Sequence, residues 1–372
     1  MQKDFHYDVI YVLAIWAGFA SEEAFKIAYA SQYVDDANNT GRIKFTNTAS
    51  YTRTSSAHET LDIKNNRNDV ENHNTWLPFH FLPGNAGYEK GQNPMGDFET
   101  LLVCTPNSYV ARDMIKEAIK SCNKDNGIHR FGIALHTYAD TWAHHGFIGA
   151  VTDKNKVRNI RRKLLNEDFV EISVVDELEN RGIDELLPVG HGPALTNPDM
   201  PFFEEWRFEY FDERGEQVFR NTESFLEAAD TLIKVMRLFQ VYRKNPMDID
   251  DNLASILSNY EGLKAEQREA LNAIFNGIQD LDGDVRHSKW SEWANDGKIP
   301  EVNIIPEYFA KGKGSWKFIA LGTESSIDDP EEVFEYTPDF LNSDWKKFHD
   351  ALQEQRQYIL LDLLPFYGIC IS

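Results

Sequence analysis

The stretch HTYADTWAHHGF, residues 136–147, constrains the fold more than any other part of the sequence. His136, Asp140 and His144 are spaced at i, i+4 and i+8, and each step advances only about 40° around an α-helix. The three side chains therefore share one stripe of a helix. Imidazole and carboxylate groups are typical ligands of zinc and similar divalent ions. The spacing predicts a metal-binding helix face; the alternative is a polar face whose histidines only form hydrogen bonds.

The distribution of histidines supports the metal-binding interpretation. Nine of the eleven histidines lie before residue 192, which is about half of the chain length. His6 opens the first expected helix, Asp35 and Asp36 close the second, and His80 lies in the apolar segment PFHFLP. Each residue alone is more often an ordinary core or capping residue. Together with the stripe on residues 136–144, they predict a shared site.

A loop with the sequence HGPALTNPD carries two further candidates, His191 and Asp199. Its glycine and proline residues are equally typical of a plain turn. Two interpretations of this loop, a ligand loop and a simple turn, therefore stay open.

Helical periodicity covers most of the chain. Ser21 is a suitable N-cap for one of these segments, and Gly18 ends the segment before it. We expect helices over residues 5–18, 21–35, 108–122, 129–147, 222–244, 252–262, 265–277 and 343–364. His349 and Asp350 fall on the last of them and indicate a surface pair.

Residues 42–60 differ from their surroundings, because they are rich in threonine and alternate in polarity. This pattern indicates a short β-hairpin or an extended insertion. The expected fold class is therefore mainly α, a multi-helix domain with a small β-hairpin insertion. Pro246 interrupts the helical pattern, so we expect a helical metal-binding domain over residues 1–245 and a helical C-terminal subdomain over residues 246–372, packed on the first.

The charge of the chain excludes one class of partner. There are 38 basic and 60 acidic residues, a formal net charge of −22. This charge repels phosphate backbones, so duplex nucleic acid is not an expected ligand. A small anionic substrate stays compatible with it if a bound metal reverses the local sign.

The location expected from the sequence is cytoplasmic. No stretch approaches the roughly 20 apolar residues of a membrane helix, so no integral membrane segment is expected. The N-terminal segment is typical of an amphipathic helix and not of a signal peptide. The three cysteines are scattered and include no CxxC pair, as is usual for free thiols in a reducing compartment.

The order of the candidate residues resembles the bacterial zinc-dependent phospholipase C and fungal single-strand nuclease superfamily. Its pattern is an early His, an Asp ending the next helix, a His, an HxxxD helix with a further His, and a late His with an acid. The matching positions in this sequence are His6, Asp35 or Asp36, His80, His136 with Asp140 and His144, and His191 with Asp199. The chain is also similar to an uncharacterised bacterial family of phospholipase-C-like proteins, through the stretches FHYD, YASQYVDD, PFHFLPG, HTYADTW and GHG…NPD. That similarity covers roughly residues 1–210.

The chain departs from the superfamily pattern in three places. Superfamily members bind one zinc through a processed N-terminal tryptophan, whereas this chain starts MQKD. His144 follows Asp140 more closely than in the superfamily, and Asp199 lies farther beyond His191 than in an HxxxE or HxxxD pair. We therefore expect a divalent metal cofactor, zinc by the resemblance, with two ions rather than three.

The function that these features predict is a metal-dependent hydrolase whose two ions activate a water molecule. The resemblance implies phospholipase C-like hydrolysis of a small phosphoester. Asp35 or Asp36 would bridge the ions or act as the base. One alternative is a metallohydrolase of amides or nucleotides; another is a non-catalytic protein with a structural metal and a partner-binding surface. The sequence contains no GxGxxG, GxxxxGK[ST] or GxSxG motif.

Overall fold

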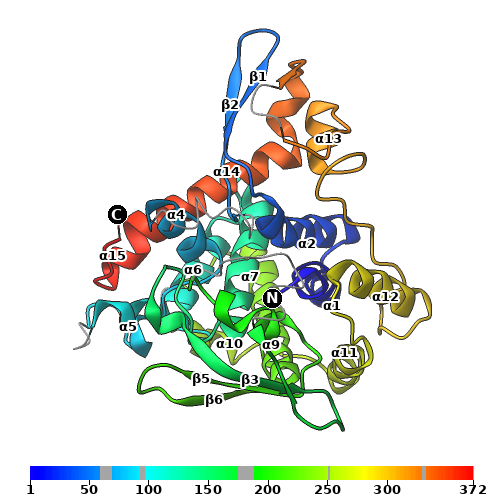
Figure 1. Ribbon diagram of the computed structural model, residues 1–372. Helices are drawn as coiled ribbons and strands as arrows, with labels where there is room; N and C mark the ends of the chain where they lie inside the picture. Colours follow the sequence, from blue (N-terminus) through cyan, green and yellow to red (C-terminus); the bar gives the residue numbers. More distant parts are fainter. Residues whose placement is uncertain (59–68, 93–96, 175–187, 250–251, 329–331, 372) are drawn as a thin grey trace.

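The computed structural model describes residues 1–58, 69–92, 97–174, 188–249, 252–328 and 332–371 (Figure 1). About 52% of the structure is helical and 10% lies in strands, which form one sheet of three strands and one of four. The expectation of a mainly α fold is therefore wrong, since the architecture is mixed α/β.

Helical elements occur along the whole length of the chain. Those up to residue 199 are η1 (Asp4–Val9), α1 (Ile10–Trp16), α2 (Ser21–Asp36), α4 (Asp69–Phe79), η2 (Asn85–Gly87), α5 (Phe98–Leu102), α6 (Tyr109–Lys120), α7 (Gly127–Ala143), η3 (Asp153–Asn155), η4 (Gly192–Ala194) and η5 (Asn197–Asp199). Those that follow are α9 (Asn221–Lys244), α10 (Leu253–Leu257), α11 (Ala265–Gly277), α12 (Gly283–Asn295), α13 (Trp316–Leu321), η6 (Pro338–Asn342), α14 (Asp344–Gln357), η7 (Tyr358–Leu363) and α15 (Leu364–Phe366). The strands are β1 (Gly41–Phe45), β2 (Ser50–Arg53), β3 (Val157–Lys163), β4 (Val170–Glu171), β5 (Glu205–Tyr210), β6 (Glu216–Phe219) and β7 (Val333–Phe334).

The helices expected from periodicity are present, but three of them differ from the expectation. Residues 5–18 divide into η1 and α1, residues 252–262 are helical only over α10, and residues 343–364 divide into α14, η7 and α15. Ser108 caps α6 by accepting a hydrogen bond from the amide of Ala111, as a serine N-cap does. Ser21, by contrast, is the first residue of α2; Ala20 occupies the cap position and no side chain caps the helix. Helix α4 lies where a loop was expected. The sequence did not indicate this helix because Pro78, near its end, is unusual inside a helix.

The four-stranded sheet was not expected from the sequence. Its strands follow the order β4-β3-β5-β6, and each neighbouring pair is antiparallel. In β5 the aromatic residues Trp206, Phe208 and Tyr210 are buried, while Arg207 and Glu209 alternate with them. This period-two pattern is visible in EWRFEY and is the signal that could have revealed the strand.

The hairpin expected within residues 42–60 is confirmed for its described part. Strand β1 pairs antiparallel with β2, from Gly41 opposite Arg53 to Lys44 opposite Ser50. Residues 59 and 60 lie outside the described residues. Strand β7 adds to the other edge of β1 in parallel, so the end of the chain contributes a third strand to this sheet. The hairpin projects from the body of the molecule beside α13 (Figure 1).

Helix α7 occupies the middle of the molecule, where it contacts α2, α6, α9 and α14 (Figure 1). Its closest neighbour is α2, and Gly132 allows this approach. A Cβ atom at Gly132 would lie 2.5 Å from the carbonyl oxygen of Ile27 and 2.8 Å from Cβ of Ala30. All the residues of α7 except Ile128 are buried, so the polar stripe of this helix lies inside the core.

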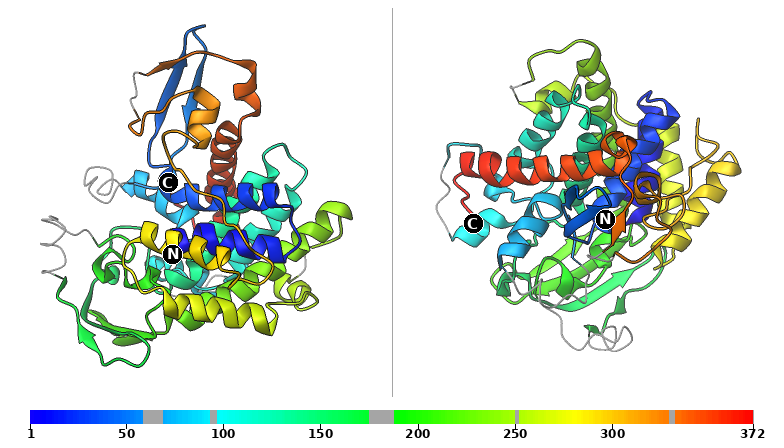
Figure 2. Two further views of the ribbon diagram at one scale, coloured as in Figure 1. Left: turned by 90° about the vertical axis from the view of Figure 1, so that its right-hand side faces the viewer. Right: turned by 90° about the horizontal axis from the view of Figure 1, so that it is seen from above.

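The buried apolar residues form one large core that runs from Met1 to Ile369 and includes residues on both sides of the expected boundary at residue 245. The division into a domain and a subdomain stays a prediction. Helix α14 crosses over the body as a long rod (Figure 2). Among the described residues, no helix has the length and apolar character that crossing a membrane requires.

Replacement of Gly132 by alanine tests the close packing of α2 on α7. The new methyl group would meet the backbone of Ile27, which cannot move without displacing α2. We expect the free energy of unfolding to fall by about 1–3 kcal/mol, as in other overpacked cores. Chemical denaturation measures the change. Gly283→Ala is the control, because its methyl group would have no neighbour closer than 3.5 Å; equal stability of the two variants would contradict the packing argument.

His349 on α14 is buried, with 3% of its surface exposed, so the expectation of a surface pair is wrong for this residue. Its Nδ1 donates a hydrogen bond to the carbonyl oxygen of Thr54 at 2.9 Å. Burial lowers the pKa of His349 to about 3; the Thr54 carbonyl and Asp328 oppose the shift, while Arg53 and Lys317 add to it.

A neutral buried histidine makes stability depend on pH. The unfolded chain binds a proton at this position below pH 6.5, but the folded chain does not until about pH 3. The contribution of His349 is therefore full above pH 6.5 and is lost as the pH falls towards 3. We expect the stability advantage of the wild type over His349→Gln to shrink by about 2 kcal/mol between pH 6.5 and 5. Urea denaturation with chelator present measures this difference, and a constant difference would contradict the assignment.

Candidate metal centre

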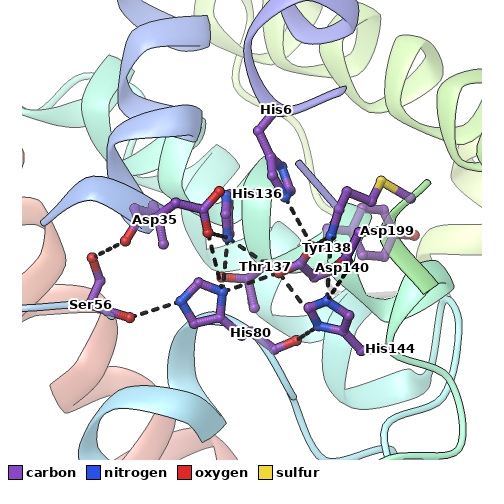
Figure 3. A network of polar contacts seen from close by, with 12 residues as sticks. His6, Asp35, Ser56, His80, His136, Thr137, Tyr138, Asp140, His144 and Asp199 are labelled. Atoms are coloured by element: carbon purple, nitrogen blue, oxygen red, sulfur yellow. Dashed lines mark hydrogen bonds and ion pairs between the residues drawn. The ribbon is translucent and has the colours of Figure 1, made fainter. Parts of the chain in front are cut away.

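Most of the metal-ligand candidates lie together in one cluster; Figure 3 shows His6, Asp35, His80, His136, Asp140, His144 and Asp199. They come from η1, the end of α2, the segment after α4, the stripe of α7 and the loop that contains η4 and η5. Three groups each offer ligand atoms within 4.8 Å of one another: His6, His136 and Asp140; Asp35, His80 and His136; and His144, His191 and Asp199.

Asp140 lies in the middle of this cluster and is 1% exposed. Its Oδ1 is 3.0 Å from Nε2 of His6, and its Oδ2 is 3.2 Å from Nε2 of His136 and 3.3 Å from Nδ1 of His80. Burial alone would raise the pKa of Asp140. His144, the amino group of Met1 and His136 outweigh burial and hold that pKa well below its usual value.

Three histidines of the cluster have one ring nitrogen bonded to a backbone carbonyl. Nε2 of His80 is 2.9 Å from the oxygen of Ser56, Nδ1 of His144 is 2.8 Å from the oxygen of His80, and Nδ1 of His191 is 2.7 Å from the oxygen of Leu195. A carbonyl oxygen only accepts hydrogen bonds, so each of these nitrogens carries the proton. In the neutral ring, the other nitrogen then presents its lone pair to the cluster, as in metal-binding histidines with outer partners.

The loop candidates belong to the cluster. Nε2 of His144 is 3.3 Å from Oδ1 of Asp199, and Nε2 of His191 is 3.4 Å from Oδ2 of the same carboxylate. The loop includes Leu195 at φ 59°, a backbone conformation that is costly for a leucine. Its carbonyl is the one that orients His191, so the strained residue lies where it directs a ligand candidate.

Asp35 and Asp36 have different surroundings, because successive helix positions differ by about 100°. Oδ1 of Asp35 is 3.8 Å from His80 and from His136. Asp36 is not brought to the cluster; it accepts hydrogen bonds from Tyr308 at 2.6 Å and from Gln32 at 3.1 Å.

The Asp35 side chain is 32% exposed, whereas those of Asp140 and Asp199 are 1% and 8% exposed. Its partial burial and the nearby Asp140 carboxylate raise the pKa of Asp35 to about 8, although His80 opposes this shift. The cluster therefore opens to solvent on the side of Asp35.

The amino group of Met1 also reaches the cluster, which the sequence interpretation did not anticipate. Its nitrogen is 2.6 Å from Oδ1 of Asp140 and 3.1 Å from Oδ1 of Asp199. Burial would lower the pKa of this amine, but the two carboxylates raise it to about 11. Two sequence signals could have placed the amine in the cluster: His6 lies only five residues along the chain, and the superfamily that the chain resembles binds one zinc through its N-terminal residue.

The residues of the cluster fit a divalent cation. Nε2 of His136 lies 3.2 Å from Nδ1 of His80, and oxygens of Asp35 and Asp140 approach both nitrogens. Lone-pair atoms from four side chains thus converge on one small space. Mixed imidazole and carboxylate donors of this kind suit zinc and neighbouring divalent ions.

Residues 1–363 match a family of unknown function, DUF6765. The chain belongs to this family. Comparisons with curated proteins and with solved structures gave no match. The similarity to zinc-dependent phospholipase C stays a prediction, and the function must be inferred from the chemistry of the site.

Metal content tests the centre directly. His136→Ala and Asp140→Ala each remove a side chain that makes two or more of the contacts within the cluster. We therefore expect metal affinity to fall at least about 100-fold. His349→Gln is the matched control, because it changes a buried helical histidine outside the cluster. Elemental analysis after purification without chelator gives the readout. Equal metal content in all three variants would contradict the assignment of the site.

Proposed function

We propose that the chain is a divalent-metal-dependent hydrolase of a small phosphoester, with zinc and two ions as the preferred cofactor. The observation that supports this most is the orientation of His80, His144 and His191, whose free ring nitrogens face buried carboxylates. Such outer hydrogen bonds are typical of histidines that bind catalytic or structural metals.

The two ions would use separate residues. Asp35, His80 and His136 would hold one ion next to Asp140, and His144, His191 and Asp199 would hold the other. The remaining group, His6, His136 and Asp140, shares His136 with the first, so we assign His6 to the support of Asp140. Bound divalent ions supply Lewis acidity and lower the pKa of water towards about 7.

The residues of the chain have distinct roles in this proposal. Asp35 is the carboxylate on the open side, so it would orient the attacking water and accept its proton. Asp140, at 1% exposure, would add a carboxylate oxygen to the ion held by Asp35, His80 and His136, while its Oδ1 accepts a hydrogen bond from His6. As the water oxygen bonds to phosphorus, the bond to the leaving oxygen breaks and that oxygen takes up a proton.

The charge of the chain supports a small substrate. A net charge of −22 opposes the approach of a long polyanion, whereas one phosphoester group meets mainly the local field of the centre. The phosphoester itself comes from the similarity to zinc-dependent phospholipase C. Hydrolysis of amides or nucleotides is the alternative within the same chemistry.

A structural metal is the second candidate function. The burial of His6, His136 and Asp140, all 0–1% exposed, favours it, since structural ions are enclosed by protein. In that case the protein would act through a partner-binding surface. The partial exposure of the Asp35 carboxylate favours catalysis, because catalytic sites keep an open side.

Hydrolysis of a chromogenic phosphodiester distinguishes the two candidates. We expect activity with zinc or manganese, loss with chelator and recovery when metal is restored. Asp35→Asn keeps the shape but removes the base, so kcat should fall about 10²–10⁴-fold. Asp36→Asn is the control, since Asp36 faces Tyr308 instead of the cluster.

The metal content of each variant is measured alongside kcat. Metal-replete protein that is inactive on phosphodiesters, phosphomonoesters and nucleotides would overturn the hydrolase and favour the structural metal. Rapid cleavage of duplex DNA would contradict the charge argument.

A further inference from the structure

Helix α12 packs against η1, the π-helical segment that carries His6 (Figures 1 and 2). Nearly 280 residues of sequence separate the two elements. Asp282 caps the start of α12 by accepting hydrogen bonds from the amides of Asp284 and Val285. This cap starts the helix just before Arg286 and His287, which form ion pairs with residues of η1.

Two buried ion pairs join these elements. Nη2 of Arg286 is 2.9 Å from Oδ1 of Asp4, and the two side chains are 1% and 2% exposed. Nδ1 of His287 is 2.7 Å from Oδ1 of Asp8, with exposures of 9% and 0%. Arg286 also donates to the side-chain oxygen of Gln2 at 2.7 Å.

The two pairs lie on either side of His6 along the chain. Two positions along a helix turn by about half a circle, so Asp4 and Asp8 face α12 while His6 faces the opposite way. His6 points to Asp140, 3.0 Å away. Helix α12 therefore contacts one side of η1, and His6 extends into the metal centre from the opposite side.

The conformation of η1 gives this contact a specific task. A π-helix is rare and short, and an unrestrained segment readily adopts the α-helical form. That change would rotate His6 relative to Asp140. Apolar packing would bury the same surface but would not fix the rotation of η1 about its axis. The charged hydrogen bonds at Asp4 and Asp8 are directional, so they do fix this rotation.

We propose that Arg286 and His287 are positioning residues of the metal centre. Through Asp4 and Asp8 they set the rotation of η1, and so the approach of His6 to Asp140. The inference rests on the metal centre of the proposed function. It gives the C-terminal third of the chain a defined task at a site made of residues from its first half.

The test uses the full-length chain and cobalt(II) as the probe. Asp4→Asn combined with Arg286→Gln removes both charges and leaves none stranded in the core. We expect the affinity for cobalt to fall at least about tenfold and its visible absorption to change, as when outer partners of ligands are altered. Asp8→Asn with His287→Gln should act in the same direction. Arg286→Lys alone keeps the charge and should retain most of the affinity and the spectrum.

Two controls separate positioning from loss of stability. Lys289→Gln changes an exposed residue of the same helix. Leu253→Ala removes a buried side chain from α10, which contacts α6 and α9. The cavity left beside α10 should lower the Tm without changing the contacts of η1. Both controls should bind cobalt as the wild type does.

The inference is overturned if the paired variants bind cobalt with the wild-type affinity and spectrum, or if Leu253→Ala loses affinity to the same extent at an equal loss of Tm. Wild-type protein that binds no divalent metal would overturn the proposed function together with this inference. Wild-type protein that binds metal, with unchanged paired variants, would overturn this inference alone.

Discussion

The buried carboxylate of Asp140 restricts how the elements around it can pack. A carboxylate that is 1% exposed has lost its water, and an unpaired buried charge costs far more than a folded domain can supply. Its charged partner is the amine of Met1, 2.6 Å from Oδ1, and Nε2 of His6 lies 3.0 Å from the same oxygen. Because His6 lies in η1 and Asp140 lies on α7, these two elements must pack in one arrangement for the carboxylate to be paired.

Residue spacing predicted the proximity of the ligand candidates better than it predicted the fold. His136, Asp140 and His144 share a stripe in any regular helix, so their proximity follows from the sequence. The choice between Asp35 and Asp36 depends on the exact rotation of α2 at its end, which spacing does not determine. The amphipathic strand EWRFEY carried a readable period-two signal, yet the helical patterns around it dominated the interpretation. The amine of Met1 carries no side-chain pattern that sequence could display.

Buried histidines illustrate a further limit of sequence reasoning. His136 and His349 both lie on helices, and they are 0% and 3% exposed. Their roles differ only in what faces the ring: Asp140 and His80 in one case, the Thr54 carbonyl and Trp345 in the other. The sequence likewise does not distinguish Arg286 and His287 from ordinary residues of a polar helix. Their pairing with Asp4 and Asp8 becomes visible only in the packing of α12 on η1.

The scatter of the ligand candidates along the chain couples the proposed ions to folding. Positions 6 to 199 come together only in the native state, so the unfolded chain offers no comparable site. A cation that binds only the native state adds about 4 kcal/mol at a free concentration a thousand times its Kd. That amount is a large fraction of the stability of a typical domain. Loss of the proposed ions would then raise the unfolded fraction of the chain as well as empty the centre, so metal supply and resistance to proteolysis would be linked.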